Sequence, residues 1–185
     1  MTTRVFHLAA AAAAAAAVLG LVRPAAAQRA GTVELDAFAR FTNFDNSLPL
    51  NNTVGVGGRA TVYLNPRLTF ELDLSRTSSR SETYTPVHAR LVGGFPTGAR
   101  VEALLGGGFV RNAYRGPLDA SDAGLSGIVA VRYHLNRRVW LRLGADFDIM
   151  FHTASDSPFS FYNGNWGLHF GVGARLNGGE GAGTQ

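Results

Sequence analysis

A short segment toward the carboxyl end of the chain holds the residue types that hydrolases use. The sequence FHTASDS contains His152, Ser155, Asp156 and Ser157. A histidine that activates a serine, with an acid that orients the histidine, is the arrangement of nucleophilic ester hydrolysis. However, His152 continues the alternation of the extended segment before it and falls on the face that carries the acids of that segment. We therefore predict no catalytic residues in this chain.

Metal and phosphate-loop chemistry are not favoured either. His88, His134 and His169 lie in three separate segments, without the close spacing that metal ligands from one helix or loop show. The glycine-rich runs GVGG and GGG lie inside extended segments and precede no helix, whereas a phosphate-binding loop opens a helix. The sequence therefore predicts no metal site and no cofactor.

The remaining chemical groups are acids and arginines, and they recur with a period of two. In WGLHFGVGARL, for example, Leu168 and Phe170 alternate with His169 and Gly171. Successive side chains of a strand point to opposite faces, so this pattern predicts a strand with one apolar face. The same alternation recurs at residues 32–42, 53–64, 68–77, 85–95, 101–114, 124–135, 139–152 and 166–176. Strands of about ten residues are long enough to cross a bilayer when they are tilted.

The charged face of these segments has two candidate environments. On a soluble lipocalin-like barrel the charges would lie outside, and the apolar face would line a ligand cavity. In a membrane barrel the apolar face would meet lipid, and the charges would pair across a narrow lumen. Several glycines, among them Gly55, Gly108 and Gly171, share the charged face, as a crowded interior requires. Aromatic residues also gather toward strand ends, which is typical of a membrane interface.

These features favour an all-β fold, an eight-stranded antiparallel up-and-down transmembrane β-barrel. Because side chains just fill the interior of such a small barrel, the charges are expected to form a structural network rather than an ion path. The predicted lumen charge network consists of Glu34, Asp36, Arg40, Arg59, Glu71, Asp73, Arg90, Glu102, Arg132, Arg142, Asp146, Asp148 and Arg175.

The connections between the segments alternate in length. Tight turns are predicted at residues 65–67, 96–100 and 136–138, and longer loops at residues 43–52, 76–85, 114–123 and 153–163. Short turns at one end and long loops at the other are typical of outer-membrane barrels, whose turns face the periplasm. Since the number of strands is even, both chain ends belong on the side of the short turns.

The beginning of the chain differs from the rest. It has a basic residue, Arg4, an apolar run rich in alanine, and three alanines before Gln28, which is the pattern of a secretory signal peptide. We expect residues 1–27 to be a signal peptide, residues 28–177 the barrel domain and residues 178–185 a flexible tail. Without the signal peptide the chain has 15 arginines and 13 acids, a net charge of +2, which gives no support for a nucleic-acid partner.

Two segments carry a family resemblance. VGVGGRATVYLNPRLTFELDLSR and WGLHFGVGARL have the glycine, aromatic and strand–turn–strand pattern of the small outer-membrane β-barrel proteins, and the chain is similar to the eight-stranded transmembrane domain of OmpA. The resemblance implies export to the cell outer membrane, assembly by the barrel-assembly machinery, and contacts with outer-membrane lipid and lipopolysaccharide. From the residues themselves we expect a structural or surface-interaction role, with no enzymatic activity and an extracellular ligand bound through the loops.

Two other functions stay open at this point. One is a soluble exported lipocalin-like barrel that binds an apolar ligand in its cavity. The other is a lipid A-modifying outer-membrane enzyme, which would use the FHTASDS segment.

Three arginines outside the predicted network point to a lipid contact. Arg76 and Arg111 lie on the lipid-facing side of their segments at the loop end, and Arg115 follows closely. Arginine binds phosphate through two parallel hydrogen bonds, so these residues are candidate contacts for the phosphorylated head groups of lipopolysaccharide. In the alternative interpretation, their side chains only extend to the membrane interface.

Overall fold

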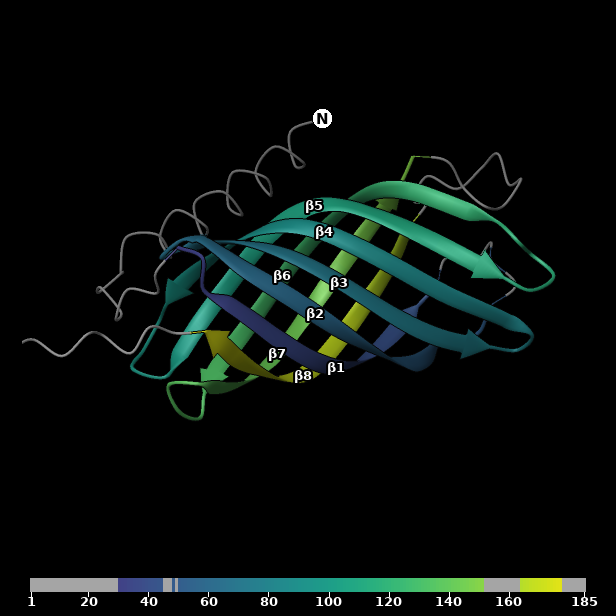
Figure 1. Ribbon diagram of the computed structural model, residues 1–185. Coiled ribbons are helices and arrows are strands. Elements are labelled where there is room, and N and C mark those ends of the chain that lie inside the picture. The colour runs from purple at the N-terminus through teal and green to yellow at the C-terminus, as the bar shows by residue number, and fades with distance from the viewer. Residues whose placement is uncertain (1–29, 45–47, 49, 152–163, 178–185) are drawn as a thin grey trace, which may run out of the picture.

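The protein folds as a closed barrel of antiparallel strands (Figure 1). The computed structural model describes residues 30–44, 48, 50–151 and 164–177. The strands are β1 (Val33–Asn43), β2 (Thr53–Asn65), β3 (Leu68–Ser79), β4 (Glu82–Pro96), β5 (Val101–Arg115), β6 (Ser121–His134), β7 (Val139–Met150) and β8 (Gly164–Asn177). Each strand pairs with the next, and β1 pairs with β8 to close the barrel. The predicted all-β, eight-stranded up-and-down topology is confirmed.

The two ends of the barrel differ in their connections. At the turn end, where β1 begins and β8 ends (Figure 1), the strands are joined by residues 66–67, 97–100 and 135–138. At the loop end they are joined by residues 44–52, 80–81, 116–120 and 151–163. The three predicted tight turns are confirmed. A search of the described residues finds no helix that is long and apolar enough to cross a membrane.

The long loop predicted at residues 76–85 is wrong. β3 and β4 continue through this stretch, and only Arg80 and Ser81 connect them. Arg80 has a φ of 54°, a left-handed conformation that tight hairpin turns use. Serine and threonine suggested a loop here, but their backbone groups extend the ladder between the two strands. The loop predicted at residues 114–123 shortens in the same way, to residues 116–120.

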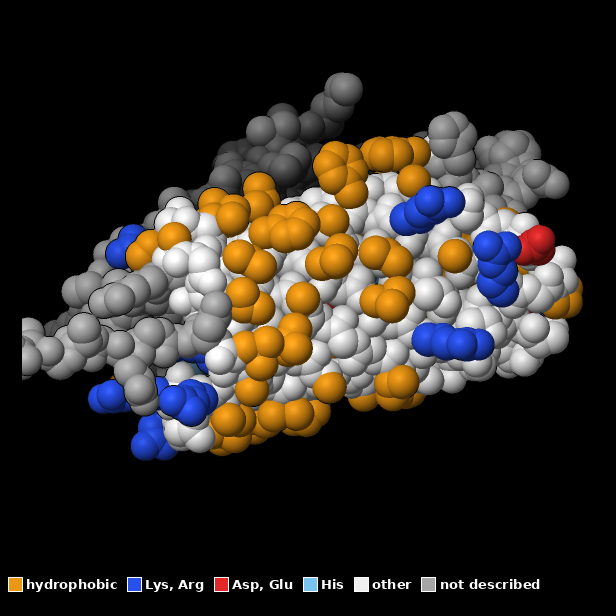
Figure 2. Space-filling view, viewed as in Figure 1, with side chains coloured by type: hydrophobic (Ala, Val, Ile, Leu, Met, Phe, Trp, Pro, Cys, Tyr) orange, Lys and Arg blue, Asp and Glu red, His pale blue; other side chains and the backbone are white. Residues whose placement is uncertain are grey.

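The two faces of each strand lie in different surroundings. The outward apolar side chains are exposed, and they form an apolar belt that includes Leu35, Val62, Leu72, Leu91, Leu105, Val129, Leu143 and Phe170. Figure 2 shows hydrophobic side chains over the middle of the visible face, with arginines toward its two ends. A soluble barrel would bury its apolar face. The exposed belt therefore favours a membrane barrel over the lipocalin-like alternative.

Inward-facing glycines allow neighbouring strands to approach closely. A Cβ atom at Gly108 would overlap the backbone carbonyl oxygen of Ala89, and one at Gly171 would lie 2.7 Å from the carbonyl oxygen of Ala37. By contrast, a Cβ atom at Gly127, on the outward face, would meet nothing within 4 Å. The close packing inside the barrel therefore depends on glycine at the first two positions.

Gly108→Ala is expected to lower the free energy of unfolding by about 1–3 kcal/mol, because the added methyl group overlaps backbone that belongs to the β4–β5 ladder. Gly127→Ala, the matched control, should stay within about 0.5 kcal/mol of the parent protein. Urea titration of the refolded barrel in detergent micelles measures both values. Equal stability of the two variants would contradict the close packing at Gly108.

Candidate functional site

The predicted lumen residues come from all eight strands, and the structure places their side chains inside the barrel. Eleven of the thirteen are buried, and Glu102 and Arg175, near the turn end, are partly exposed. The strand register sets opposite charges directly across from one another. Asp36 pairs with Arg59 between β1 and β2, and Glu102 pairs with Arg132 between β5 and β6.

The layer nearest the turn end centres on Glu34. Its carboxylate accepts a hydrogen bond from the Tyr63 hydroxyl at 3.3 Å. Arg132 and Arg175 form ion pairs with the same carboxylate at 3.2 and 3.1 Å. Arg132 also reaches Glu102 at 3.3 Å. One buried acid thus connects residues from β1, β2, β6 and β8.

The middle layer contains a bridge across the barrel. Arg142 on β7 donates two hydrogen bonds to the Glu71 carboxylate on β3, at 2.7 and 3.0 Å. Arg59 lies beside this pair, with its Nε 3.6 Å from Glu71 and 3.4 Å from Asp73. Arg90 donates a further hydrogen bond to Asp73. Because β3 and β7 are four strands apart in the barrel, the Glu71–Arg142 bridge joins opposite walls.

The third layer lies toward the loop end. Arg40 donates a hydrogen bond to Asp146 at 2.6 Å and forms an ion pair with Asp148 at 3.3 Å. His88, considered above as a metal ligand, instead contacts Asp73 at 2.7 Å and Asp148 at 3.2 Å. With this layer, every acid of the predicted network lies within ion-pair distance of a basic side chain. Such pairing is what makes buried charges tolerable.

Two inward-facing groups were not among the predicted site residues. Val92, Leu104, Ile128 and Ala130 form a buried apolar cluster on β4, β5 and β6. At the loop end, Phe44, Tyr84 and Tyr114 form an aromatic cluster, with the Phe44 and Tyr84 rings 4.9 Å apart. The sequence did contain a signal for the first group, because the inward face of residues 101–114 is mostly aliphatic or glycine.

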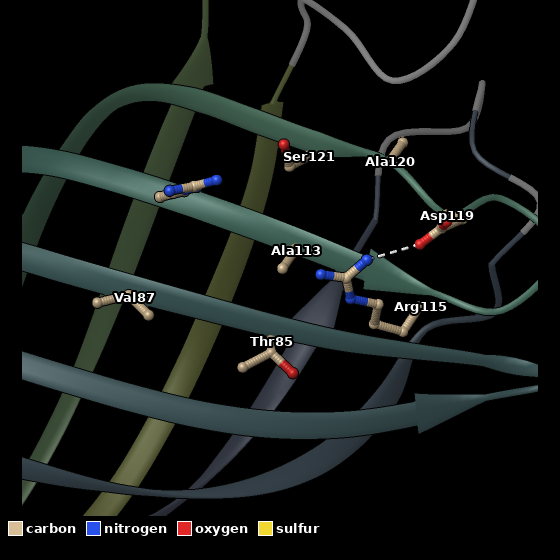
Figure 3. A pocket seen from close by; sticks show the side chains of 8 residues that line it. Thr85, Val87, Ala113, Arg115, Asp119, Ala120 and Ser121 are labelled. Carbon is tan, nitrogen blue, oxygen red and sulfur yellow. Dashed lines mark hydrogen bonds and ion pairs between the residues drawn. The ribbon is translucent and has the colours of Figure 1, made fainter.

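The candidate lipid-binding arginines lie on the outer surface toward the loop end. Arg76 on β3 and Arg111 and Arg115 on β5 are all exposed. A cavity of about 400 Å³ opens beside Arg111 and Arg115, but Arg76 does not line it. Its other lining residues are Thr85, Val87, Ala113, Asp119, Ala120 and Ser121 (Figure 3).

An ion pair forms one edge of this outer cavity. Arg115 Nη1 lies 2.7 Å from Asp119 Oδ1, and both side chains are about two-thirds exposed or more, as the dashed line in Figure 3 indicates. Exposed pairs of this kind contribute little to stability, so Arg115 can exchange this partner for another anion at small cost. The candidate catalytic segment from His152 onward, the predicted signal peptide and the predicted tail lie outside the described residues.

An outward apolar belt around a closed, charged interior defines a transmembrane β-barrel. Residues 8–183 match the model of the outer membrane protein beta-barrel domain family. The chain therefore belongs to this family, which locates the protein in the outer membrane. A search among curated proteins finds no match.

Solved structures of outer-membrane barrels share the fold. Neisserial surface protein A is 21% identical, with a TM-score of 0.57, and the alignment covers 78% of this chain and 96% of that one. For the N-terminal β-barrel domain of Pseudomonas aeruginosa OprF the identity is 13%, the TM-score 0.60 and the coverage 80% and 100%. For Pseudomonas aeruginosa OprG these values are 12%, 0.58, and 82% and 98%. At such low identity the likeness concerns the fold alone.

Glu71→Gln is expected to lower the free energy of unfolding by about 3–5 kcal/mol, because it leaves the buried guanidinium of Arg142 without its carboxylate. The control, Asp119→Asn, breaks the exposed pair with Arg115 and should cost less than about 1 kcal/mol. Urea titration in lipid vesicles measures both. A Glu71→Gln variant as stable as the control would show that the buried bridge does not stabilise the barrel.

Proposed function

We propose that this protein is a non-enzymatic, structural barrel of the outer membrane whose lumen is closed by its charge network. The observation that carries this proposal is the Glu71–Arg142 bridge between β3 and β7, with both side chains about 1% exposed. The bridge spans the lumen between opposite walls, and the side chains of Arg59 and Arg90 occupy the lumen at the same depth. Together they leave no open path for ions beside the bridge. Export through the signal peptide at residues 1–27 and insertion by the barrel-assembly machinery belong to the same proposal.

The arrangement of the inner polar groups supports a structural role over an enzymatic one. Each acid of the network contacts a basic group, so these carboxylates are engaged in ion pairs rather than available as a general base. A lipid A-modifying enzyme would also need its reacting groups at the outer rim, where lipid A lies. The apolar and aromatic clusters fill part of the interior and reinforce the closed state.

In planar bilayers the protein is expected to show no steady conductance. The double variant Glu71→Ala/Arg142→Ala removes the cross-barrel bridge without changing the net charge, and it should produce discrete conductance steps. The control, Arg115→Ala/Asp119→Ala, removes an ion pair outside the barrel and should remain silent. Steady conductance through the parent protein would contradict a closed lumen, and a silent double variant would assign the closure to other residues.

A second role is favoured by the outer cavity beside Arg111 and Arg115. Arg111, Arg115, Thr85 and Ser121 are among its lining residues, and their guanidinium and hydroxyl groups are donors of the kind that bind phosphate oxygens. In barrels of this class the loop end faces the outer leaflet. The cavity therefore fits a phosphorylated head group of lipopolysaccharide. Arg76 lies on β3, which pairs with β4, the strand that carries Thr85 and Val87 of the lining. Its exposed side chain can reach a second phosphate there.

The triple variant Arg76→Gln/Arg111→Gln/Arg115→Gln is expected to bind lipopolysaccharide about tenfold or more weakly, because it removes several charge-assisted hydrogen bonds. The control, Arg67→Gln/Arg100→Gln/Arg137→Gln, has the same change of charge at the turn end and should bind like the parent protein. Lipopolysaccharide retained by the purified barrels, and titration in nanodiscs, provide the measurement. If the parent protein and both triple variants retain equal amounts of lipopolysaccharide, Arg76, Arg111 and Arg115 only anchor the barrel at the membrane interface.

A further inference from the structure

Exposed arginines occupy all three connections at the turn end. Arg67 joins β2 to β3, Arg100 joins β4 to β5, and Arg137 and Arg138 join β6 to β7. We call Arg67, Arg100 and Arg137 the turn arginines. They lie at the opposite end of the barrel from the outer cavity, and neither the lumen network nor the lipopolysaccharide proposal uses them.

The strand ladders hold the backbone of Arg67 and Arg100 directly, and that of Arg137 through the next residue, Arg138. The residue just before β3 is Arg67, and its carbonyl accepts a hydrogen bond from the Gly94 amide at 2.8 Å. The carbonyl of Arg100, just before β5, accepts one from His134 at 2.7 Å. The carbonyl of Arg138, just before β7, accepts one from Arg175 at 2.9 Å. The same backbone hydrogen bond therefore recurs just before β3, β5 and β7.

Asparagine fixes two of these turns further. The Asn65 side-chain oxygen accepts hydrogen bonds from the amides of Arg67 and Leu68, at 2.8 and 2.9 Å. Asn136 repeats this contact with Arg138 and the following residue, at 2.8 and 2.9 Å. The backbone under the arginines is thus ordered, and their charges lie at a defined depth relative to the belt.

That depth corresponds to the lipid head groups. Leu64 and Leu135 point outward and are 49% and 46% exposed, so the apolar surface extends to the last residues of β2 and to the residue after β6. Arg67 follows Leu64 by three residues, and Arg137 follows Leu135 by two. A strand advances about 3.3 Å per residue, and the head-group layer is about 5–8 Å thick. The guanidinium groups therefore lie within reach of this layer.

The charge of this end is of one sign among the described residues. Among the described residues Asp119 is the only exposed acid, and it lies at the loop end, away from the turn arginines. Glu34 and Glu102 lie near the turn end but are directed into the lumen, where Arg132 contacts both. An exposed basic set beside a membrane attracts anionic lipid.

We propose that the turn arginines bind anionic phospholipid head groups of the inner leaflet of the outer membrane. The chemistry is that of a phosphate diester held by guanidinium groups. Depth favours this partner over the anionic cell-wall polymer, because the arginines directly follow the belt rather than project from a long periplasmic segment. This inference concerns a different leaflet and different residues from the lipopolysaccharide proposal, so either can fail without the other.

Quenching by brominated lipids can measure the lipid composition around one end of the barrel. Trp140→Phe and Trp166→Phe remove the two tryptophans of the chain. Leu135→Trp then places a reporter beside Arg137, and Phe109→Trp, in a separate protein, places one beside Arg111. Each is refolded into vesicles that contain brominated phosphatidylglycerol or brominated phosphatidylcholine at the same mole fraction. The ratio of the two quenching efficiencies reports local enrichment of the anionic lipid.

The Leu135→Trp reporter is expected to show enrichment of phosphatidylglycerol by about two- to fivefold at low salt, and the enrichment should decline as salt is added. Arg67→Gln/Arg100→Gln/Arg137→Gln should reduce it about twofold or more at this reporter, where Arg138 keeps its charge, and leave the Phe109→Trp reporter unchanged. The charge-matched control Arg76→Gln/Arg111→Gln/Arg115→Gln should preserve it. Lysine at the three turn positions should retain most of it.

Several results would overturn the proposal. One is a quenching ratio at the Leu135→Trp reporter that the turn substitutions leave unchanged. Another is an equal loss of phosphatidylglycerol enrichment at this reporter in the control triple variant, because such a loss would reflect the net charge of the protein alone. Loss of binding to isolated peptidoglycan by the turn variant, with its lipid preference intact, would assign the arginines to the cell wall. If the turn variant fails to refold, the proposal is tested by adding salt to the Leu135→Trp reporter protein that keeps all its arginines. A preference for phosphatidylglycerol that salt does not reduce would contradict binding by charge.

Discussion

Hydrocarbon on the outside of the barrel determines where the polar side chains of this protein lie. Lipid chains accept no hydrogen bonds, so a charged group at membrane depth has to find its partners inside the protein. Asp73 illustrates the result, since it is 1% exposed and Arg59, His88 and Arg90 all contact it. The apolar belt and the inner charge network are therefore two consequences of one constraint.

Most of the fold follows from the sequence because a strand repeats every two residues. Once alternation locates a strand and a short turn fixes its partner, the register follows, and pairs such as Asp36 with Arg59 can be expected. The Glu71–Arg142 bridge could not be predicted in this way. It joins β3 to β7, and its existence depends on the closure of the whole barrel rather than on any local pattern.

The errors at the loop end have a physical cause. Beyond the belt a strand has no apolar face, so the alternation that identifies strands disappears while the backbone ladder continues. Thr77 pairs with Tyr84 in a stretch that composition assigned to a loop. The same effect hid one member of the aromatic cluster, because Tyr84 lies in this stretch although its side chain is 1% exposed. Predictions from hydrophobic pattern therefore end where the membrane ends.

The closed barrel also separates charge by sign. Among the described residues one of ten acids is exposed, whereas eight of fourteen arginines are: Arg67, Arg76, Arg80, Arg100, Arg111, Arg115, Arg137 and Arg138. The formal net charge of the chain, +4, therefore understates how basic the outer surface is. Each acid of the predicted lumen network lies beside a basic side chain inside the barrel, so its charge is balanced there rather than at the membrane surface. The planar guanidinium group suits both places, since it bonds carboxylates inside the barrel and phosphates outside it with the same paired geometry. A sequence without lysine can thus supply both the inner network and a basic outer surface from one residue type.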